Sequence, residues 1–188
     1  MKTATNNTRR SFLISCAGAS SAMLTVSLSA CQESAADGRQ LQFSSLAAAQ
    51  EELAQLAQAK ELISGTAWNW AQTLIHCAQS IEYSMTGFPQ SKSTLFQHTI
   101  GSTALTLFSW RGRMTHDLAD PIPGAPMLAI SADAAQALLR LRSAILQFQQ
   151  WQAPLKPHFA YGALSKNEYE LAHAMHIANH ISMFRAKA

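Results

Sequence analysis

Charged residues are scarce in this chain, and no excess of one sign remains once its beginning is set aside. They make up 13% of the 188 residues, with 14 basic and 11 acidic side chains. Three basic residues, Lys2, Arg9 and Arg10, lie within the first 31 residues, which hold no acidic residue, so 11 of each sign remain. A neutral domain lacks the basic footprint of a nucleic-acid or anionic-membrane binder. We therefore expect no nucleic-acid partner.

Cysteine and strand-like patterning are also scarce. The three cysteines are Cys16, Cys31 and Cys77, and apolar and polar residues nowhere alternate for long enough to predict a strand. The sequence contains no internal repeats and no low-complexity tracts. After residue 43, apolar residues recur at helical spacing almost throughout. These absences favour an all-α fold.

The first 31 residues are predicted to be a targeting segment. Residues 8–13, with Arg9 and Arg10 in the middle, match the pattern of a twin-arginine export signal, and residues 11–30 carry no charge. Residues 28–31 end in Cys31 and resemble the lipobox of bacterial lipoproteins, whose cysteine is acylated. An uncleaved membrane anchor is disfavoured by the Ser-rich, weakly apolar composition. We expect a lipid-anchored protein of the periplasm or cell envelope that touches the membrane only through this anchor.

Residues 32–42 are interpreted as a polar tether and residues 43–188 as one helical domain. About 155 residues remain after the leader, which is enough for one domain with a substantial core. Cys77 is the one cysteine in that part of the sequence. An internal disulfide is therefore excluded, even in an oxidising compartment.

The helical pattern predicts an antiparallel four-helix bundle with an additional helix or a long Pro-rich loop. Ser44 or Ser45 is expected to cap a first helix that ends near residue 60, and Trp68 faces inward within the second. The other helices are expected at residues 67–85, 93–110, 133–151 and 165–184, the last with a Ser165/Glu168 capping box. Between them, residues 112–130 hold three prolines and two glycines, which predict an irregular loop too long for a simple connector.

Histidines in the last predicted helix provide the best lead to function. His173, His176 and His180 fall on a stripe that spans about 60° of the helical wheel. His176 and His180 are one turn apart, so both rings can approach the same ion. His76 lies mid-helix among apolar and small neutral residues, where a histidine must either hydrogen-bond internally or bind a ligand.

An i, i+4 pair with one histidine from a neighbouring helix supplies three nitrogen ligands and leaves one coordination position open. The favoured ligands are His76, His176 and His180, and the expected ion is divalent zinc, nickel, copper or iron. His173 then either contacts a ligand without binding the ion or has no role at the site. A His173/His176 ligand pair at i, i+3 stays open as an alternative. A purely structural role for His76 also stays open.

Other candidates carry weaker signals. His158 and Tyr161 precede the last helix and could reach over the mouth of the site as a proton donor or a substrate contact, although plain packing explains them equally well. His116 is interpreted as a solvated or locally hydrogen-bonded residue. Cys77 is interpreted as a small packed residue, and Glu82 is turned too far from His76 around its helix to share an ion.

Residues 68–82, together with the H-x-x-x-H of residues 176–180, resemble the DinB-like superfamily of metal-binding helical bundles. Residues 87–89, 123–126 and 158–162 are similar to its branch called Domain of Unknown Function 1569, and the resemblance covers nearly the whole chain after the leader. It implies a bundle with one divalent ion, held at the positions of His76, His176 and His180. Members with assigned activities include thiol-dependent transferases and a maleylpyruvate isomerase, which work in a reducing cytoplasm. The predicted export of this chain departs from that setting.

Two classes of function follow. The first is a metal-dependent hydrolase or transferase, in which the open coordination position activates water, a thiol or a carbonyl. The second is a non-catalytic lipoprotein that binds a metal or a small molecule. A bundle whose histidines are only polar core residues is a third possibility. The expected partners are a metal ion and an unidentified small molecule, and a homodimer stays open.

Overall fold

The computed structural model describes residues 38–187. The predicted targeting segment, with Arg9, Arg10 and Cys31, lies outside the described residues, as does the tether up to residue 37. Residues 38–42, the rest of the predicted tether, run along the last helix, where the Arg39 amide donates to the Ser182 carbonyl at 2.8 Å. Within residues 38–187, no helix has the length and apolar character needed to cross a membrane.

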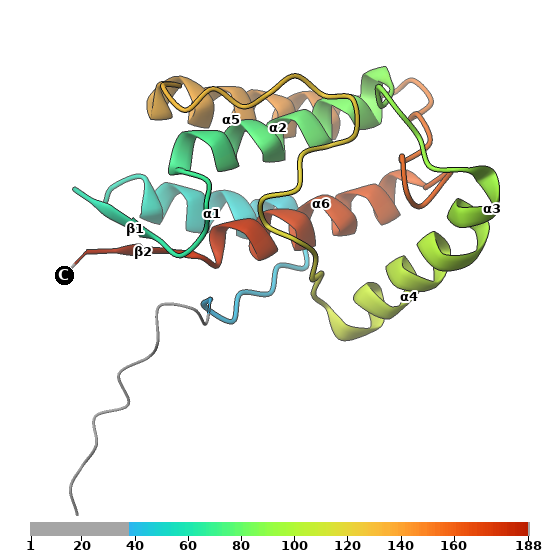
Figure 1. Cartoon of the computed structure of the whole chain (residues 1–188), viewed down its shortest axis with the longest axis horizontal. Coiled ribbons are helices and arrows are strands. Elements are labelled where there is room, and N and C mark those ends of the chain that lie inside the picture. Colours follow the sequence, from blue (N-terminus) through green and yellow to red (C-terminus); the bar gives the residue numbers. More distant parts are fainter. Residues whose placement is uncertain (1–37, 188) are drawn as a thin grey trace, which may run out of the picture. The chain divides into compact units, whose positions relative to one another are not determined.

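Four long helices form the described domain and confirm the predicted all-α class (Figure 1). They are α1 (Leu46–Leu56), α2 (Trp70–Thr86), α5 (Ala134–Gln150) and α6 (Lys166–Ile181). The additional helix predicted at residues 93–110 is also present. It consists of α3 (Thr94–Phe96), the π-helical turn η1 (Gln97–Gly101) and α4 (Ser102–Arg111) in direct succession.

The helices run in two directions, with α2 and α5 parallel to each other and opposite to α1 and α6 (Figure 1). The Asn69 side-chain amide, just before α2, donates to the Ile130 carbonyl, which precedes α5. At the other end, the Lys156 amide, after α5, donates to the carbonyl of Ser84 near the end of α2. Residues 112–133 must therefore return along the bundle between α4 and α5, which accounts for the length of the predicted Pro-rich loop.

Side-chain caps set where the helices begin. The predicted Ser165/Glu168 capping box is present at the start of α6. A second box, which the sequence analysis missed, joins Asn69 and Gln72 and starts α2 at Trp70. Trp68 therefore lies before the helix and not inside it, contrary to the prediction.

A two-stranded sheet follows the first and last long helices. The strands β1 (Leu62–Ser64) and β2 (Phe184–Ala186) pair antiparallel, with Leu62 opposite Ala186. Helix α1 ends at Leu56 instead of residue 60, and α6 ends at Ile181 instead of residue 184. Three-residue strands are too short to show a period-two pattern, so the sequence predicts neither of them.

The core lies between the four long helices. Its largest fully buried side chains include Leu53, Leu74, Leu141, Phe148 and Ile177. Cys77 is fully buried among them, as predicted, and burial raises the pKa of its thiol. Fully burying one large aliphatic side chain contributes roughly 1.5–3 kcal/mol, so this interior holds the helices, and hence their histidines, in register.

Gly101 lets the α3–α4 arm approach the segment before α6. A Cβ placed on Gly101 would lie 1.9 Å from the Ala160 carbonyl oxygen. Because the backbone of Gly101 is helical, with φ −63°, alanine would otherwise be favoured there by about 1 kcal/mol. Because of the close contact with Ala160, we expect alanine at this position to destabilise the protein instead.

We expect Gly101→Ala to lower the free energy of unfolding by about 1–3 kcal/mol, the usual cost of overpacking. Urea unfolding followed by circular dichroism measures it. Ser109→Ala, at an exposed position of α4, is the matched control and should change stability by less than about 0.5 kcal/mol. An equally or more stable Gly101→Ala protein would show that the arm does not pack here as described.

Candidate metal centre

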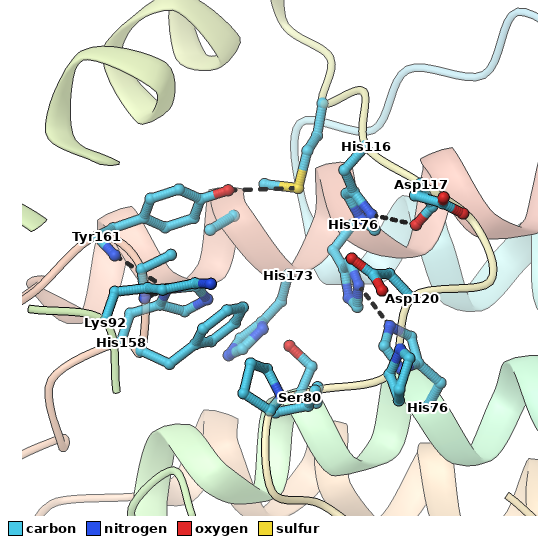
Figure 2. A pocket seen from close by; sticks show the side chains of 17 residues that line it. His76, Ser80, Lys92, His116, Asp117, Asp120, His158, Tyr161, His173 and His176 are labelled. Atoms are coloured by element: carbon cyan, nitrogen blue, oxygen red, sulfur yellow. Dashed lines mark hydrogen bonds between the residues drawn. The ribbon is translucent and has the colours of Figure 1, made fainter. Parts of the chain in front are cut away.

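Three histidine rings from two helices meet at one point. His76 comes from α2, and His176 and His180 come from successive turns of α6. The ring centroids lie 4.6–5.0 Å apart, and one nitrogen from each ring can be chosen so that all three lie within 4.8 Å of one another. Figure 2 shows His76 and His176 facing each other, with their Nε2 atoms 3.1 Å apart. The structure thus brings together the three residues predicted as ligands.

The helices position these rings through ordinary core packing. Buried Leu74 and Cys77 flank His76 on α2, and buried Ile177 and Ala178 lie between the two histidines of α6. His76 and His180 are themselves 3% and 1% exposed, whereas His176 keeps some exposed surface. The site is therefore enclosed on the core side and reachable at His176.

The rings are held in their neutral form. Burial, followed by the nearby His116, lowers the pKa of His76 to about 3. Burial and neighbouring imidazoles also hold the pKa values of His176 and His180 well below the ordinary value of 6.5. A neutral imidazole offers a lone pair, which is what a metal ion requires.

The donor atoms fit a divalent ion with nitrogen ligands. Two nitrogens bound to one tetrahedral zinc at about 2.0–2.1 Å lie roughly 3.4 Å apart, close to the 3.1 Å between His76 and His176. Among the described residues, the buried Nε2 of His180 and Nδ1 of His76 have no hydrogen-bond partner. A buried polar atom without a partner is costly, and an ion would relieve that cost for whichever of these atoms coordinated it.

Two aromatic rings flank the three histidines. Trp68 stacks on His180 at 5.9 Å between centroids and tilts against His76 at 4.8 Å. His116, from the loop after α4, stacks on His176 at 5.2 Å and meets His180 edge-on at 4.9 Å. His116 is exposed and bonded to the Asp117 carbonyl at 2.7 Å, in keeping with the predicted local hydrogen bond. Its contact with the site was missed, because an irregular loop carries no periodicity that could place it.

His173 lies apart from the three-histidine cluster. Its Nε2 is 3.2 Å from the Ser84 hydroxyl, and its ring stacks on Tyr169 and meets Phe148 edge-on. Burial lowers its pKa to about 3. The ring is thus a packed, hydrogen-bonded neighbour of the site, and it also lines the cavity described below.

His158 and Tyr161 form a second ring pair before α6. Their rings stack at 4.2 Å with an angle of 8°. The backbone amides of Ala160 and Tyr161 both donate to His158 Nδ1, at 3.1 and 3.2 Å. Burial, followed by His173 and His116, lowers the pKa of His158 to about 3, so the ring is neutral and carries its proton on Nε2.

A cavity of about 250 Å³ connects the histidine cluster with this ring pair (Figure 2). The loop after α4 supplies one wall, and α2, α6 and the segment before α6 supply the others. The lining includes His76, Lys92, Met114, His116, Ile122, His158, Tyr161, His173 and His176. A cavity of this volume suits a small molecule.

Glu82 takes no part in the cluster. Its carboxylate accepts two hydrogen bonds from Arg140 of α5, from Nε at 2.8 Å and from Nη2 at 2.6 Å. This surface ion pair between α2 and α5 is consistent with the prediction that Glu82 does not share an ion with His76.

Comparison with known proteins gives a family but no characterised relative. No curated protein and no solved structure matches the chain. One family model, described as "Protein of unknown function (DUF1569)", matches residues 35–187. That span contains every described histidine discussed above, and it confirms the predicted branch. The chain belongs to the DUF1569 family.

Proposed function

We propose that this protein binds one divalent transition metal ion through His76, His176 and His180. The observation that carries the proposal is the convergence of three neutral imidazoles from two helices, with ligand atoms within 4.8 Å of one another. The His180 Nε2 atom, buried and without a partner among residues 38–187, adds to it. The resemblance to the DinB-like superfamily implies the same ligand set.

The proposed ion would face the cavity, since both His76 and His176 line it. Three protein ligands leave a coordination position open, the pattern of a catalytic or exchangeable site. An ion held there would supply a Lewis acid to a group that enters this position. We favour a metal-dependent hydrolase or transferase acting on a small molecule. The alternative is a protein that binds a metal or a small molecule without catalysis. A loaded protein with no exchangeable ligand on the ion and no turnover would favour this alternative.

The nitrogen-only donor set favours zinc, nickel, copper or iron(II), with no thiolate involved.

We further propose export by the twin-arginine route and acylation of Cys31, on the sequence patterns around Arg9, Arg10 and residues 28–31. Proteins that cross the membrane already folded can be loaded inside the cell, before they meet the ions of the envelope. Loading with metal inside the cell is one explanation of this route, and rapid folding before export is an equally good one.

Elemental analysis of protein purified without an affinity tag tests the proposal. We expect about one transition metal ion per chain, removable by a chelator and restored by adding the same ion. Melting curves of the loaded and stripped forms should differ, because an ion that binds the folded state stabilises it. A wild-type protein that holds no transition metal, and whose melting temperature does not respond to added ions, would overturn the metal assignment.

A further inference from the structure

The end of the cavity away from His76 is lined by hydrogen-bond donors. Lys92, His158 and Tyr161 gather on one side of the pocket in Figure 2, with His76, His176 and Asp120 on the other. The Lys92 amide bonds to the Phe159 carbonyl at 2.8 Å, which ties this lysine to the segment that carries His158 and Tyr161. The fold therefore places the Lys92 backbone beside His158 and Tyr161, and the exposed Lys92 side chain lines the cavity from there.

Each of the three groups has donor capacity left. Within residues 38–187, no carboxylate forms an ion pair with the Lys92 ammonium. The Tyr161 hydroxyl has one weak contact, 4.0 Å from the Met114 sulfur, and burial raises its pKa to about 12, so it keeps its proton.

His158 is a donor by elimination. Two backbone amides already donate to its Nδ1, at 3.1 and 3.2 Å. A nitrogen that accepts hydrogen bonds carries no proton, so the proton of the neutral ring lies on Nε2. No hydrogen bond to that atom is found among the described residues. The backbone of residues 158–161 thus fixes Nε2 as the ring nitrogen that can donate.

We infer that Lys92 Nζ, Tyr161 Oη and His158 Nε2 form an oxyanion corner that binds the carboxylate of a small ligand. Hydrogen bonds to an ionised acceptor are stronger than those between neutral groups, and a lysine supplies one compact positive charge. One cation suits a monoanion, and Asp117 and Asp120 at the opposite side of the cavity disfavour a second negative charge there.

Between the two ends, Figure 2 shows His173 and Ser80. Apolar side chains, including Met114, Ile122, Phe159 and Ala172, also line the cavity. The ligand is therefore expected to be a small monocarboxylate with an apolar body, whose far end reaches the histidine cluster. That far-end assignment rests on the proposed metal function, whereas the corner itself can be tested without metal.

Calorimetric titration of metal-free protein with hexanoate and hexanamide tests the corner. The two probes have the same apolar body and differ in charge. We expect hexanoate to bind about tenfold more tightly than hexanamide, the scale of a hydrogen-bonded charge. Lys92→Met should remove that preference, and Tyr161→Phe, which keeps the ring stacked on His158, should weaken hexanoate several-fold. Lys60→Met changes an exposed lysine outside the cavity and should change neither affinity.

Three outcomes would overturn the inference: equal affinity for both probes, unchanged hexanoate binding in Lys92→Met, or no hexanoate binding at its highest soluble concentration. Repeating the titrations on zinc-loaded protein detects carboxylate that binds the ion directly, since such binding does not depend on Lys92. A protein that holds no metal but binds hexanoate through Lys92 would overturn the proposed function and keep the corner. A protein that holds metal but ignores Lys92→Met would do the reverse.

Discussion

His180→Gln is expected to lower the affinity of this protein for Zn²⁺ by at least about 100-fold. Substitution of a residue that merely orients a ligand already costs 10–100-fold, and His180 would be a ligand itself. The glutamine fills similar space but offers an amide in place of the ring nitrogen. His76→Gln should give the same loss from the opposite helix. Competition with a chromogenic chelator measures both affinities.

Two controls separate loss of a ligand from loss of packing. His98→Gln changes an exposed histidine of η1 and should leave the affinity unchanged. His173→Gln changes a buried histidine bonded to Ser84, and should lower stability while metal affinity stays within about tenfold. If His173→Gln lost metal as completely as His180→Gln, the ligand set would have to be redrawn.

Stabilisation by Zn²⁺ should distinguish the same two groups of proteins, those that keep all three proposed ligands and those that lack one. At 100 times the dissociation constant, an ion that binds only the folded state adds about 2.7 kcal/mol to the free energy of unfolding. Wild type and His98→Gln should gain this increment on addition of Zn²⁺, and His76→Gln and His180→Gln should not. If the histidines serve only as polar core residues, Zn²⁺ should leave the free energy of unfolding unchanged in wild type and in all three variants.

Acid is expected to unfold the metal-free protein well above the pH at which carboxylates alone titrate. The pKa values of His76, His158 and His173 are lowered by burial to about 3, and that of His180 is lowered as well. In the unfolded chain these rings titrate near 6.5. Between about pH 6.5 and pH 3, the unfolded chain therefore binds protons that the folded protein excludes.

Because of this difference in bound protons, the free energy of unfolding falls as the pH falls. The stabilising effect of neutral burial is fully present above pH 6.5 and is lost as the pH falls through the window, at up to about 1.4 kcal/mol per pH unit for each histidine. Several such groups together approach the 5–15 kcal/mol that holds a typical domain folded. Urea unfolding of chelator-treated protein at pH 7, 6 and 5 measures the loss.

The variant His173→Gln should reduce the slope by about one proton, because it removes one of the titrating groups. His98→Gln, at an exposed position, should leave the slope unchanged. A free energy of unfolding that is constant between pH 7 and pH 5 would mean that these rings are already protonated or solvated in the folded protein.

Part of the histidine cluster can be predicted from the sequence, because helical periodicity is local information. Spacing alone places His176 and His180 on one face of a helix, and the apolar surroundings of His76 indicate its burial. It does not state that α2 and α6 meet at those turns. The family resemblance supplied that pairing, and the structure agrees with it.

The parts that sequence analysis missed depend on contacts between distant segments. Periodicity alone predicts that Trp68 lies inside a helix, whereas the Asn69/Gln72 cap leaves it before α2, where it stacks on His180. His116 and Lys92 lie in irregular segments, where no period predicts a direction. The short strands β1 and β2 are stabilised by each other and not by a local pattern.

The separation between the helices that carry the histidine cluster and the returning segment at residues 112–133 has an evolutionary consequence. His76, His176 and His180 are fixed by the packed interior, while Met114, His116 and Ile122 belong to a connection whose backbone is largely irregular. Substitutions in that connection can change which small molecule fits the cavity without unfolding the domain or moving the three histidines. Members of one lineage could therefore diversify their chemistry through this one stretch while keeping the same three histidines.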